Sequence, residues 1–280
     1  MEKDIRSVVK YFSIFDYPPD FDEIYTFFPK KTPRKAVKTA ILKMERHKKI
    51  KVIVGGTRYT VGEYGMQGNN FNLSQRNAIS KRKLNDWRFR AYKWLISHLP
   101  QIKLIGLSGS ISMMNAKRND DIDLFIITAR KRLYTGRFLS LMVGQVLGLR
   151  RKYGEEEAKS KICLNLFFDE GSLKVPKKKQ TLFVGHEVLQ MRPVTNKDDA
   201  YARFLRANSW VYGIFPNAFR LIPKAQSNST NTNVIGDWVE AVLKYLQLAL
   251  INSHKTTETI TDGQLWFHPD DFEKKINERL

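Results

Sequence analysis

The sequence predicts an α+β protein in three parts, with boundaries near residues 1–65, 66–200 and 201–280. Apolar residues recur at helical spacing through the first 47 residues, and two short strand-like runs follow. Two longer runs rich in β-branched residues, 102–107 and 122–128, have the length of buried strands. From about residue 200 the spacing is helical again. We therefore expect an N-terminal helical unit, a central mixed sheet with flanking helices, and a helical C-terminal cap.

The N-terminal part should contain three helices and a β-hairpin. Apolar residues at 5, 8, 9, 12 and 15 predict a first helix, which the prolines at 18 and 19 end. Asp20 can cap a second helix over 21–28, and Thr32 before Pro33 predicts the start of a third, which runs to about His47. Residues 50–61, with two glycines in the middle, are typical of a hairpin. This order of elements resembles a winged helix.

Basic residues on the third predicted helix make DNA a candidate partner. Arg34, Lys35 and Lys38 lie largely off its apolar stripe. In a winged helix such a face can contact phosphates or bases. The alternative is a solvated basic face on a module that only packs or binds protein, and the sequence does not choose between the two.

Charge and cysteine usage limit the classes of partner. The net charge of +20, from 48 basic and 28 acidic residues, attracts polyanions such as nucleic acid and triphosphates, although it can also serve solubility alone. A single cysteine, Cys163, excludes an intrachain disulfide and a thiolate zinc cluster, which favours a cytoplasmic location. No run approaches the roughly twenty apolar residues that span a bilayer, so we expect no membrane partner.

The segment before the first long strand is both basic and aromatic. Residues 72–100 carry seven arginines and lysines, and the later part should form a helix. We expect its aromatic residues Trp87, Tyr92 and Trp94 to pack onto the sheet rather than to stack on bases. Its basic flank can still face a nucleic acid.

The segment best suited to chemistry runs from Ser108 to Thr128 and reads SGSISMMNAKRNDDIDLFIIT. Gly109 permits a tight turn and the close approach of a ligand, and the hydroxyls of Ser110 and Ser112 add donors, so the turn suits a phosphate. Side chains two positions apart on a strand share a face, which brings Asp121 and Asp123 together.

Two adjacent carboxylates destabilise one another unless a proton or a cation lies between them. Oxygen ligands favour Mg²⁺, or Mn²⁺ in its place, which binds together with substrate phosphates. The pattern therefore predicts in-line transfer of a nucleotidyl group from a nucleoside triphosphate. Either element alone is usually a solvated turn or strand end, and it is their combination between two strands that favours chemistry.

The turn, ten intervening residues and the Asp-Ile-Asp-Leu run resemble the signature of the DNA polymerase beta-like nucleotidyltransferase superfamily. The resemblance implies that Gly109 and Ser110 hold the β and γ phosphates and that Asp121 and Asp123 bind metal. It also implies a third carboxylate on a neighbouring strand. The later strand, 162–168, has Asn165 there instead, which is a poor general base and leaves less charge for a second metal. The alternative to a role in the metal site is that Asn165 is a buried amide whose side chain is hydrogen-bonded to main chain.

Three further cations are candidates for the triphosphate. Lys117 and Arg118 lie between the turn and the carboxylates, and Arg137 lies on a helix expected over 130–149. Because the chain is basic almost everywhere, ordinary surface charge is the alternative for all three.

These observations favour a metal-dependent nucleotidyltransferase that moves a nucleoside monophosphate to an unknown acceptor, with a winged-helix module that binds DNA or regulates it. The competing hypothesis is a non-catalytic regulator that senses a nucleotide or binds DNA through a degenerate transferase domain, and Asn165 favours it. A third hypothesis is that the chain is an antitoxin-like partner of another protein.

Overall fold

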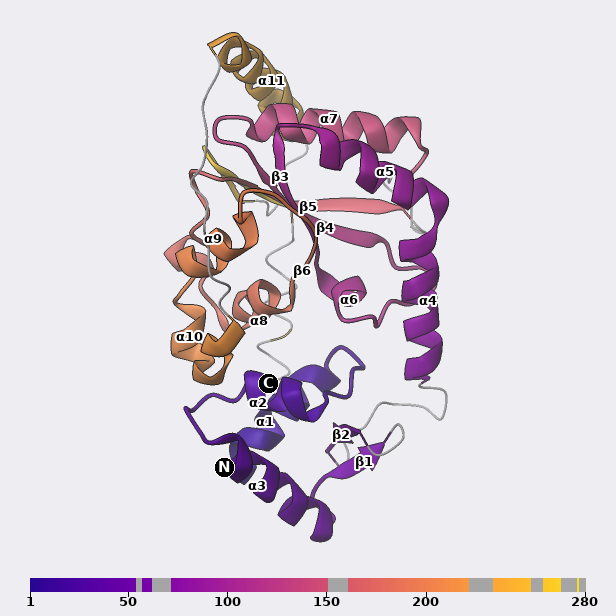
Figure 1. Ribbon diagram of the computed structural model, residues 1–280, viewed down its shortest axis with the longest axis vertical. Coiled ribbons are helices and arrows are strands. Elements are labelled where there is room, and N and C mark those ends of the chain that lie inside the picture. The colour runs from indigo at the N-terminus through magenta and orange to yellow at the C-terminus, as the bar shows by residue number, and fades with distance from the viewer. Residues whose placement is uncertain are drawn as a thin grey trace.

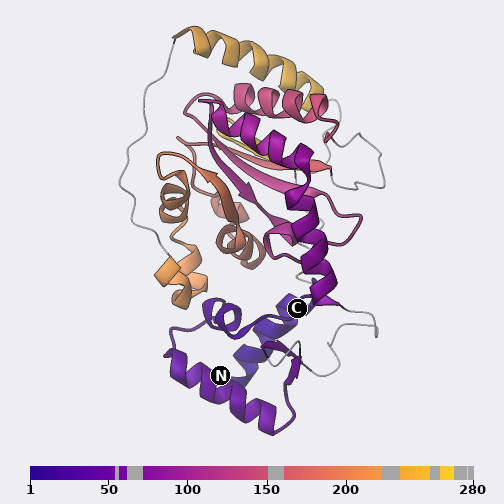
Figure 2. The same cartoon turned by 45° about the vertical axis from the view of Figure 1, so that its right-hand side comes forward.

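The computed structural model describes residues 1–53, 57–61, 72–150, 161–221, 234–252, 259–267 and 276. A central sheet lies in the middle of an elongated molecule, with α5, α7 and α11 toward one end and the N-terminal helices at the other (Figures 1 and 2). The structure combines helices with a mixed six-stranded sheet, which confirms the expected mixture of helices and a mixed sheet.

The N-terminal unit contains three helices and a two-stranded hairpin, as expected. The elements are α1 (Glu2–Ser13), α2 (Phe21–Thr26), α3 (Arg34–Arg46), β1 (Lys51–Ile53) and β2 (Arg58–Thr60). Helix α2 begins at a capping box in which Asp20 and Glu23 each accept the other's backbone N–H. Helix α3 has Pro33 itself as its N-cap, one residue later than the sequence predicts.

Six strands form the central sheet in the order β6-β3-β4-β5-β8-β7. Their bounds are β3 (Ile102–Leu107), β4 (Ile122–Thr128), β5 (Ile162–Asp169), β6 (Arg192–Asn196), β7 (Thr259–Thr261) and β8 (Gln264–Trp266). Strands β4 and β5 are parallel and every other neighbouring pair is antiparallel, so the sheet is mixed.

The helices cover two opposite faces of this sheet. The helices after the N-terminal unit are α4 (Leu73–Asn85), α5 (Trp87–His98), α6 (Gly109–Ser112), α7 (Leu133–Val146), α8 (Leu182–Gln190), α9 (Ala200–Ala207), α10 (Val211–Ile214) and α11 (Val234–Asn252), with 3-10 turns at Lys177–Lys179 and Pro216–Leu221. On one face Leu124 of β4 packs in a cluster with Tyr92 of α5 and Tyr134 of α7. On the other face Phe125 packs against Phe204 of α9. The alternation of a strand separates the two clusters.

The N-terminal unit shares its core with the second of these faces. His186 of α8 is stacked between the rings of Tyr11 and Phe27, with centroids 3.7 and 4.1 Å away. Asn217 adds polar contacts, since its side chain accepts the backbone N–H of Thr32 and donates to the carbonyl of Tyr25. The unit is therefore packed against the layer of helices that also borders the candidate site.

Two expectations from the sequence are wrong. The C-terminal region is not only helical, because β7 and β8 pair with each other and with β5 and extend the central sheet. Within α5, Tyr92 is buried as expected, but Trp87 and Trp94 are 69% and 60% exposed. Helix α5 has two apolar sides, and the sheet covers only one. Within the described residues, no helix combines the length and the apolarity of a membrane-spanning segment.

Candidate functional site

The turn after β3 has a conformation that requires glycine. Gly109 has φ +57°, and a Cβ at this position would lie 2.8 Å from Oδ2 of Asp123. Any other residue would meet both the strain of the left-handed region and the carboxylate. The turn is therefore packed directly against the first acidic side chain of β4, as the sequence motif predicts.

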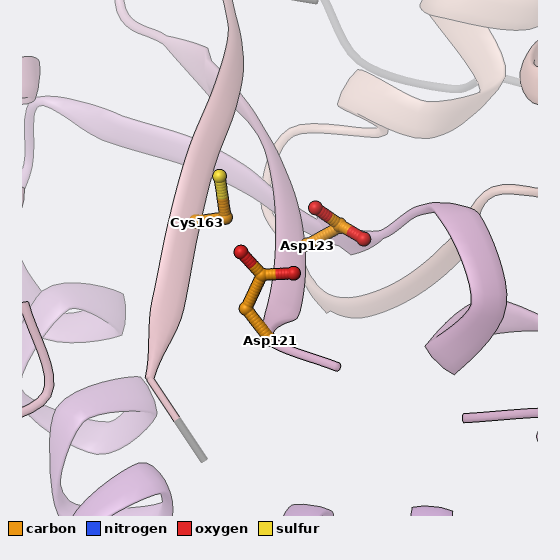
Figure 3. A group of neighbouring side chains, drawn as sticks. All are labelled: Asp121, Asp123 and Cys163. Atoms are coloured by element: carbon orange, nitrogen blue, oxygen red, sulfur yellow. The ribbon is translucent and has the colours of Figure 1, made fainter. Parts of the chain in front are cut away.

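Asp121 and Asp123 lie on one side of the chain at the start of β4. Asp123 pairs in register with Cys163 of β5, and ligand atoms from all three side chains lie within 4.8 Å of one another. Figure 3 shows these side chains beside one another across the two parallel strands. The strand ends thus bring two carboxylates together, and they add a thiol that the sequence motif did not include.

Asn165 joins this group through side-chain hydrogen bonds. Its amide donates to Oδ1 of Asp123, and its oxygen accepts a hydrogen bond from Sγ of Cys163 at 2.6 Å. A register shift between Leu124 and Phe125, in the pairing of β4 with β5, accompanies this placement. Asn165 is buried, as the alternative hypothesis expects. Its side chain, however, bonds to Asp123 and Cys163 and not to main chain.

The electrostatics of the site disfavour a second negative charge. Burial raises the pKa of Asp123 to about 8, and the charges of Asp121 and Glu187 add to the rise, although the hydrogen bond from Asn165 opposes it. A carboxyl with this pKa holds its proton at neutral pH unless a cation replaces it. The geometry and the pKa both fit a cation-binding site.

Glu187 of α8 is an acidic residue of the site that the motif did not reveal. The backbone N–H of Gly109 donates a hydrogen bond to its carboxylate, and burial raises its pKa to about 7. The carboxylate of Glu187 thus accepts the N–H of Gly109, a donor that the sequence motif assigns to phosphate. The available signal was a single acidic residue in the otherwise uncharged helix 182–190, and a pattern of that kind is usually read as a surface position.

The serines of the turn are used to hold its shape. Ser110 donates to Oδ2 of Asp120 at 2.9 Å, and the backbone N–H of Lys117 donates to the same oxygen at 2.8 Å. Ser112 is buried and donates to the carbonyl of Gly109. The hydroxyl of Ser110 closes the loop between the turn and the acids, and that of Ser112 closes the turn itself, so phosphate binding by either would require a change of partner.

A buried lysine supports the same loop. Lys83 of α4 is 3% exposed, and its ammonium donates to the carbonyls of Arg118 and Asp120. Burial lowers the pKa of Lys83, although the negative charges of Asp120 and Asp121 act to raise it. Lys83 therefore fixes the backbone that leads into the acidic pair, a role that its position in a basic segment did not indicate.

The candidate cations lie in three different environments. Lys117 and Arg118 are exposed on the loop, and the ammonium of Lys117 lies 3.4 Å from Asp16 of the N-terminal unit. Arg137 lies on the opposite face of the sheet from Asp123, where it donates to Gln247 of α11 and covers the ring of Phe267. A triphosphate-binding role for Arg137 is therefore wrong for this arrangement, because helix α7 packs on the other side of β4.

The basic residues considered for DNA are far from the acidic site, on the N-terminal unit. Arg34 is paired with Asp22 at 2.5 Å and covers the rings of Phe21 and Tyr25. Lys35 and Lys38 are exposed on α3. Helix α3 forms the far end of the molecule, away from β4 and β5 (Figure 1).

Comparison with protein-family models, with curated proteins and with solved structures finds no match for this chain. The chemistry of the site therefore rests on its own donors. The two carboxylates suit a hard divalent cation such as Mg²⁺ or Mn²⁺. The thiol of Cys163 is a soft ligand and here donates to the amide oxygen of Asn165, which leaves the carboxylate oxygens of Asp121 and Asp123 as the natural ligands.

Proposed function

We propose that this protein is a metal-dependent nucleotidyltransferase that transfers a nucleoside monophosphate from a nucleoside triphosphate to an acceptor, in the cytoplasm. The observation that carries the proposal is the packing of Asp123 against the glycine turn, with Asp121 within the same group of ligand atoms. This juxtaposition would bring the two binding functions of a nucleotidyl transfer site, for metal and for phosphate, into direct contact.

Asp121 and Asp123 would hold Mg²⁺ or Mn²⁺, which supplies charge neutralisation of the triphosphate when bound. Asp123 must lose its proton to do so, and Asn165 stabilises the ionised form by donating to Oδ1. Gly109 would present its N–H to a phosphate oxygen after Glu187 releases it. Lys117 and Arg118 are exposed on the loop that joins the turn to the acids. They are the candidate cations for neutralising the leaving pyrophosphate.

The test is metal-dependent transfer of label. The full chain is incubated with α-labelled nucleoside triphosphates, Mg²⁺ or Mn²⁺, and nucleic-acid and protein acceptors. We expect labelled acceptor with the wild type and none with Asp121→Asn. Asp262→Asn, which removes an exposed acid on the β7–β8 turn, is the matched control and should transfer normally. Transfer that survives Asp121→Asn would contradict the proposal.

A non-catalytic regulator is the second candidate, and two observations favour it. Asn165 stands where a third carboxylate is expected, and the carboxylate of Glu187 already occupies the N–H of Gly109. This form of the protein would bind nucleotide and metal without turnover. Binding of Mn²⁺ and a nucleoside triphosphate by calorimetry, without transfer to any acceptor, would support it over the enzyme.

We further propose that the N-terminal unit is a winged-helix module that regulates the site or binds DNA. Its order of elements supports the class, and its contacts support the regulatory role. Asn115, in the segment after α6, donates to the carbonyl of Phe15, and Asp16 is paired with Arg76 and Lys117. Exposed Lys35 and Lys38 support DNA binding. A salt-dependent gel shift that disappears in Lys35→Glu/Lys38→Glu would establish it.

A further inference from the structure

Helix α11 directs its polar and charged residues toward the rest of the chain and an apolar side away from it. Its three described charged residues are all engaged: Asp237 pairs with Arg132, Glu240 accepts the N–H groups of Tyr134 and Thr135, and Lys244 pairs with Asp262. These contacts, together with Gln247, which donates to the carbonyl of Tyr134, fix one side of α11 on α7. Figures 1 and 2 show α11 outermost in this layer.

The outward side of α11 carries large apolar residues. Trp238 is 71% exposed and Tyr245 is 76% exposed, with Val239, Val242 and Leu246 also exposed beside them. Two alanines, Ala241 and Ala249, complete this face. Large exposed apolar patches usually mark interaction surfaces. Among the residues that the structure describes, none covers this face of α11.

The neighbouring helix extends the surface. Phe138, Met142 and Val146 of α7 are exposed at four-residue intervals. At about 150 to 250 Å² for a large side chain, the exposed parts of these residues and of the α11 face amount to on the order of 800 Å². Each partner in a stable interface of standard size contributes about this area.

The spacing on α11 fits a helix partner. Trp238, Val242, Tyr245 and Ala249 follow one another at intervals of four, three and four residues, which is the seam of a coiled coil. When this seam is paired antiparallel with itself about the middle of α11, each aromatic residue of the seam meets a smaller one. The pairs are Trp238 with Ala249 of the partner subunit and Tyr245 with Val242 of the partner subunit. Such alternation of size is what close packing needs.

Charge does not oppose a second copy at this particular face. The chain carries a net charge of +20, so two copies repel wherever their charged surfaces approach. The outward face of α11 has no charged side chain among its described residues, which allows two copies to meet there without that cost. An acidic partner would find no complementary charge on it. A membrane surface would normally require basic residues along the flank of the helix.

We propose that the protein is a homodimer in which α11 packs antiparallel on α11 of a second copy, about a two-fold axis near the middle of the helix. The pairing overlaps almost the whole of the 19-residue helix. It is isologous, as two-fold interfaces are, so each half contributes the same residues.

Sedimentation equilibrium of the full chain tests this arrangement. We expect twice the chain mass of 32.6 kDa at micromolar concentration. Tyr245→Glu should weaken the dimer at least 100-fold, whereas Leu42→Glu, at an exposed leucine in the middle of α3, should leave it unchanged. The melting temperature of each variant is measured as well, so that loss of association can be distinguished from loss of the folded state.

A pair of double variants tests the register. In Val242→Lys/Tyr245→Glu each new lysine faces a new glutamate of the other copy, so the dimer should recover. Val242→Glu/Tyr245→Glu should stay monomeric. A parallel pairing would place like charges opposite each other in both variants, so failure of the first to recover would overturn the register. A wild type that is monomeric at 100 μM, or that binds anionic vesicles as a monomer, would overturn the dimer itself.

Discussion

Asp123→Asn should make the metal-free protein more stable above neutral pH, although it removes a residue that we place at the centre of the site. In the unfolded chain this carboxyl ionises near its ordinary pKa of 3.8, whereas burial and the neighbouring acids raise its pKa in the folded chain to about 8. Between these two values the folded state binds the extra proton. The contribution of Asp123 to stability is therefore complete at low pH and is lost as the pH rises to 8.

The magnitude follows from the size of the shift. A difference of about four units corresponds to at most ~6 kcal/mol, at ~1.4 kcal/mol for each unit. Asp123 is only partly screened from solvent, and a high effective dielectric reduces the cost of its charge to about 2 to 3 kcal/mol. The neutral amide avoids this cost and can still bond to Asn165 after rotation. For a chain of this size the gain corresponds to roughly 4 to 10 °C in melting temperature.

Thermal unfolding at pH 5 and at pH 8.5, in the presence of a chelator, measures the effect. The gain from Asp123→Asn should be large at pH 8.5 and small at pH 5. Added Mn²⁺ should raise the melting temperature of the wild type but not of the variant. Asp262→Asn, at an exposed acid whose pKa is lowered by Lys244, should show no such gain. A variant that is less stable than the wild type at pH 8.5 would refute the electrostatic account of the site.

Three other predictions concern the frame of the site. Gly109→Ala should lower the free energy of unfolding in urea by about 1 to 2 kcal/mol from backbone strain. The loss should be larger than for Gly148→Ala, since Gly148 has a similar φ but no atom within 4 Å of the added Cβ. Equal losses would exclude the contact with Asp123. Lys83→Met should cost about 1 to 3 kcal/mol by leaving two carbonyls unsatisfied, while a neutral result would show that the loop does not need the ammonium. Burial lowers the pKa of His186, so stability should fall as the pH drops below 6.5, and His186→Phe should abolish that fall in acid titration.

Much of the fold was predictable because it depends on local periodicity. The helices α1 and α3, the hairpin and the strands β3, β4 and β5 all lie where apolar spacing places them. The wrong expectations concern elements whose position depends on distant partners. Strands β7 and β8 are three residues each, too short to show a period, and they are strands because the edge of β5 is available for pairing.

The candidate site was predictable in part for the same reason. The period of a strand places Asp121 and Asp123 on one side, and only a glycine fits the turn beside them, so both features can be read from consecutive residues. Glu187 and Lys83 could not be predicted, because they reach the site from helices 64 residues after and 40 residues before Asp123. Arg137 was assigned to the wrong face because sequence proximity to a strand does not say which side its helix covers.

The sequence by itself determined the class of fold, the glycine turn and the acidic pair, since each follows from the geometry of a few neighbouring residues. The tertiary structure decided which side chains surround that pair: an amide and a thiol from a parallel strand, and a carboxylate from a helix that shares its core with the N-terminal unit. It also decided that α11 presents an apolar face that no described segment covers. Burial and pairing between distant segments set the pKa values and the surfaces of the protein, and no local pattern encodes them.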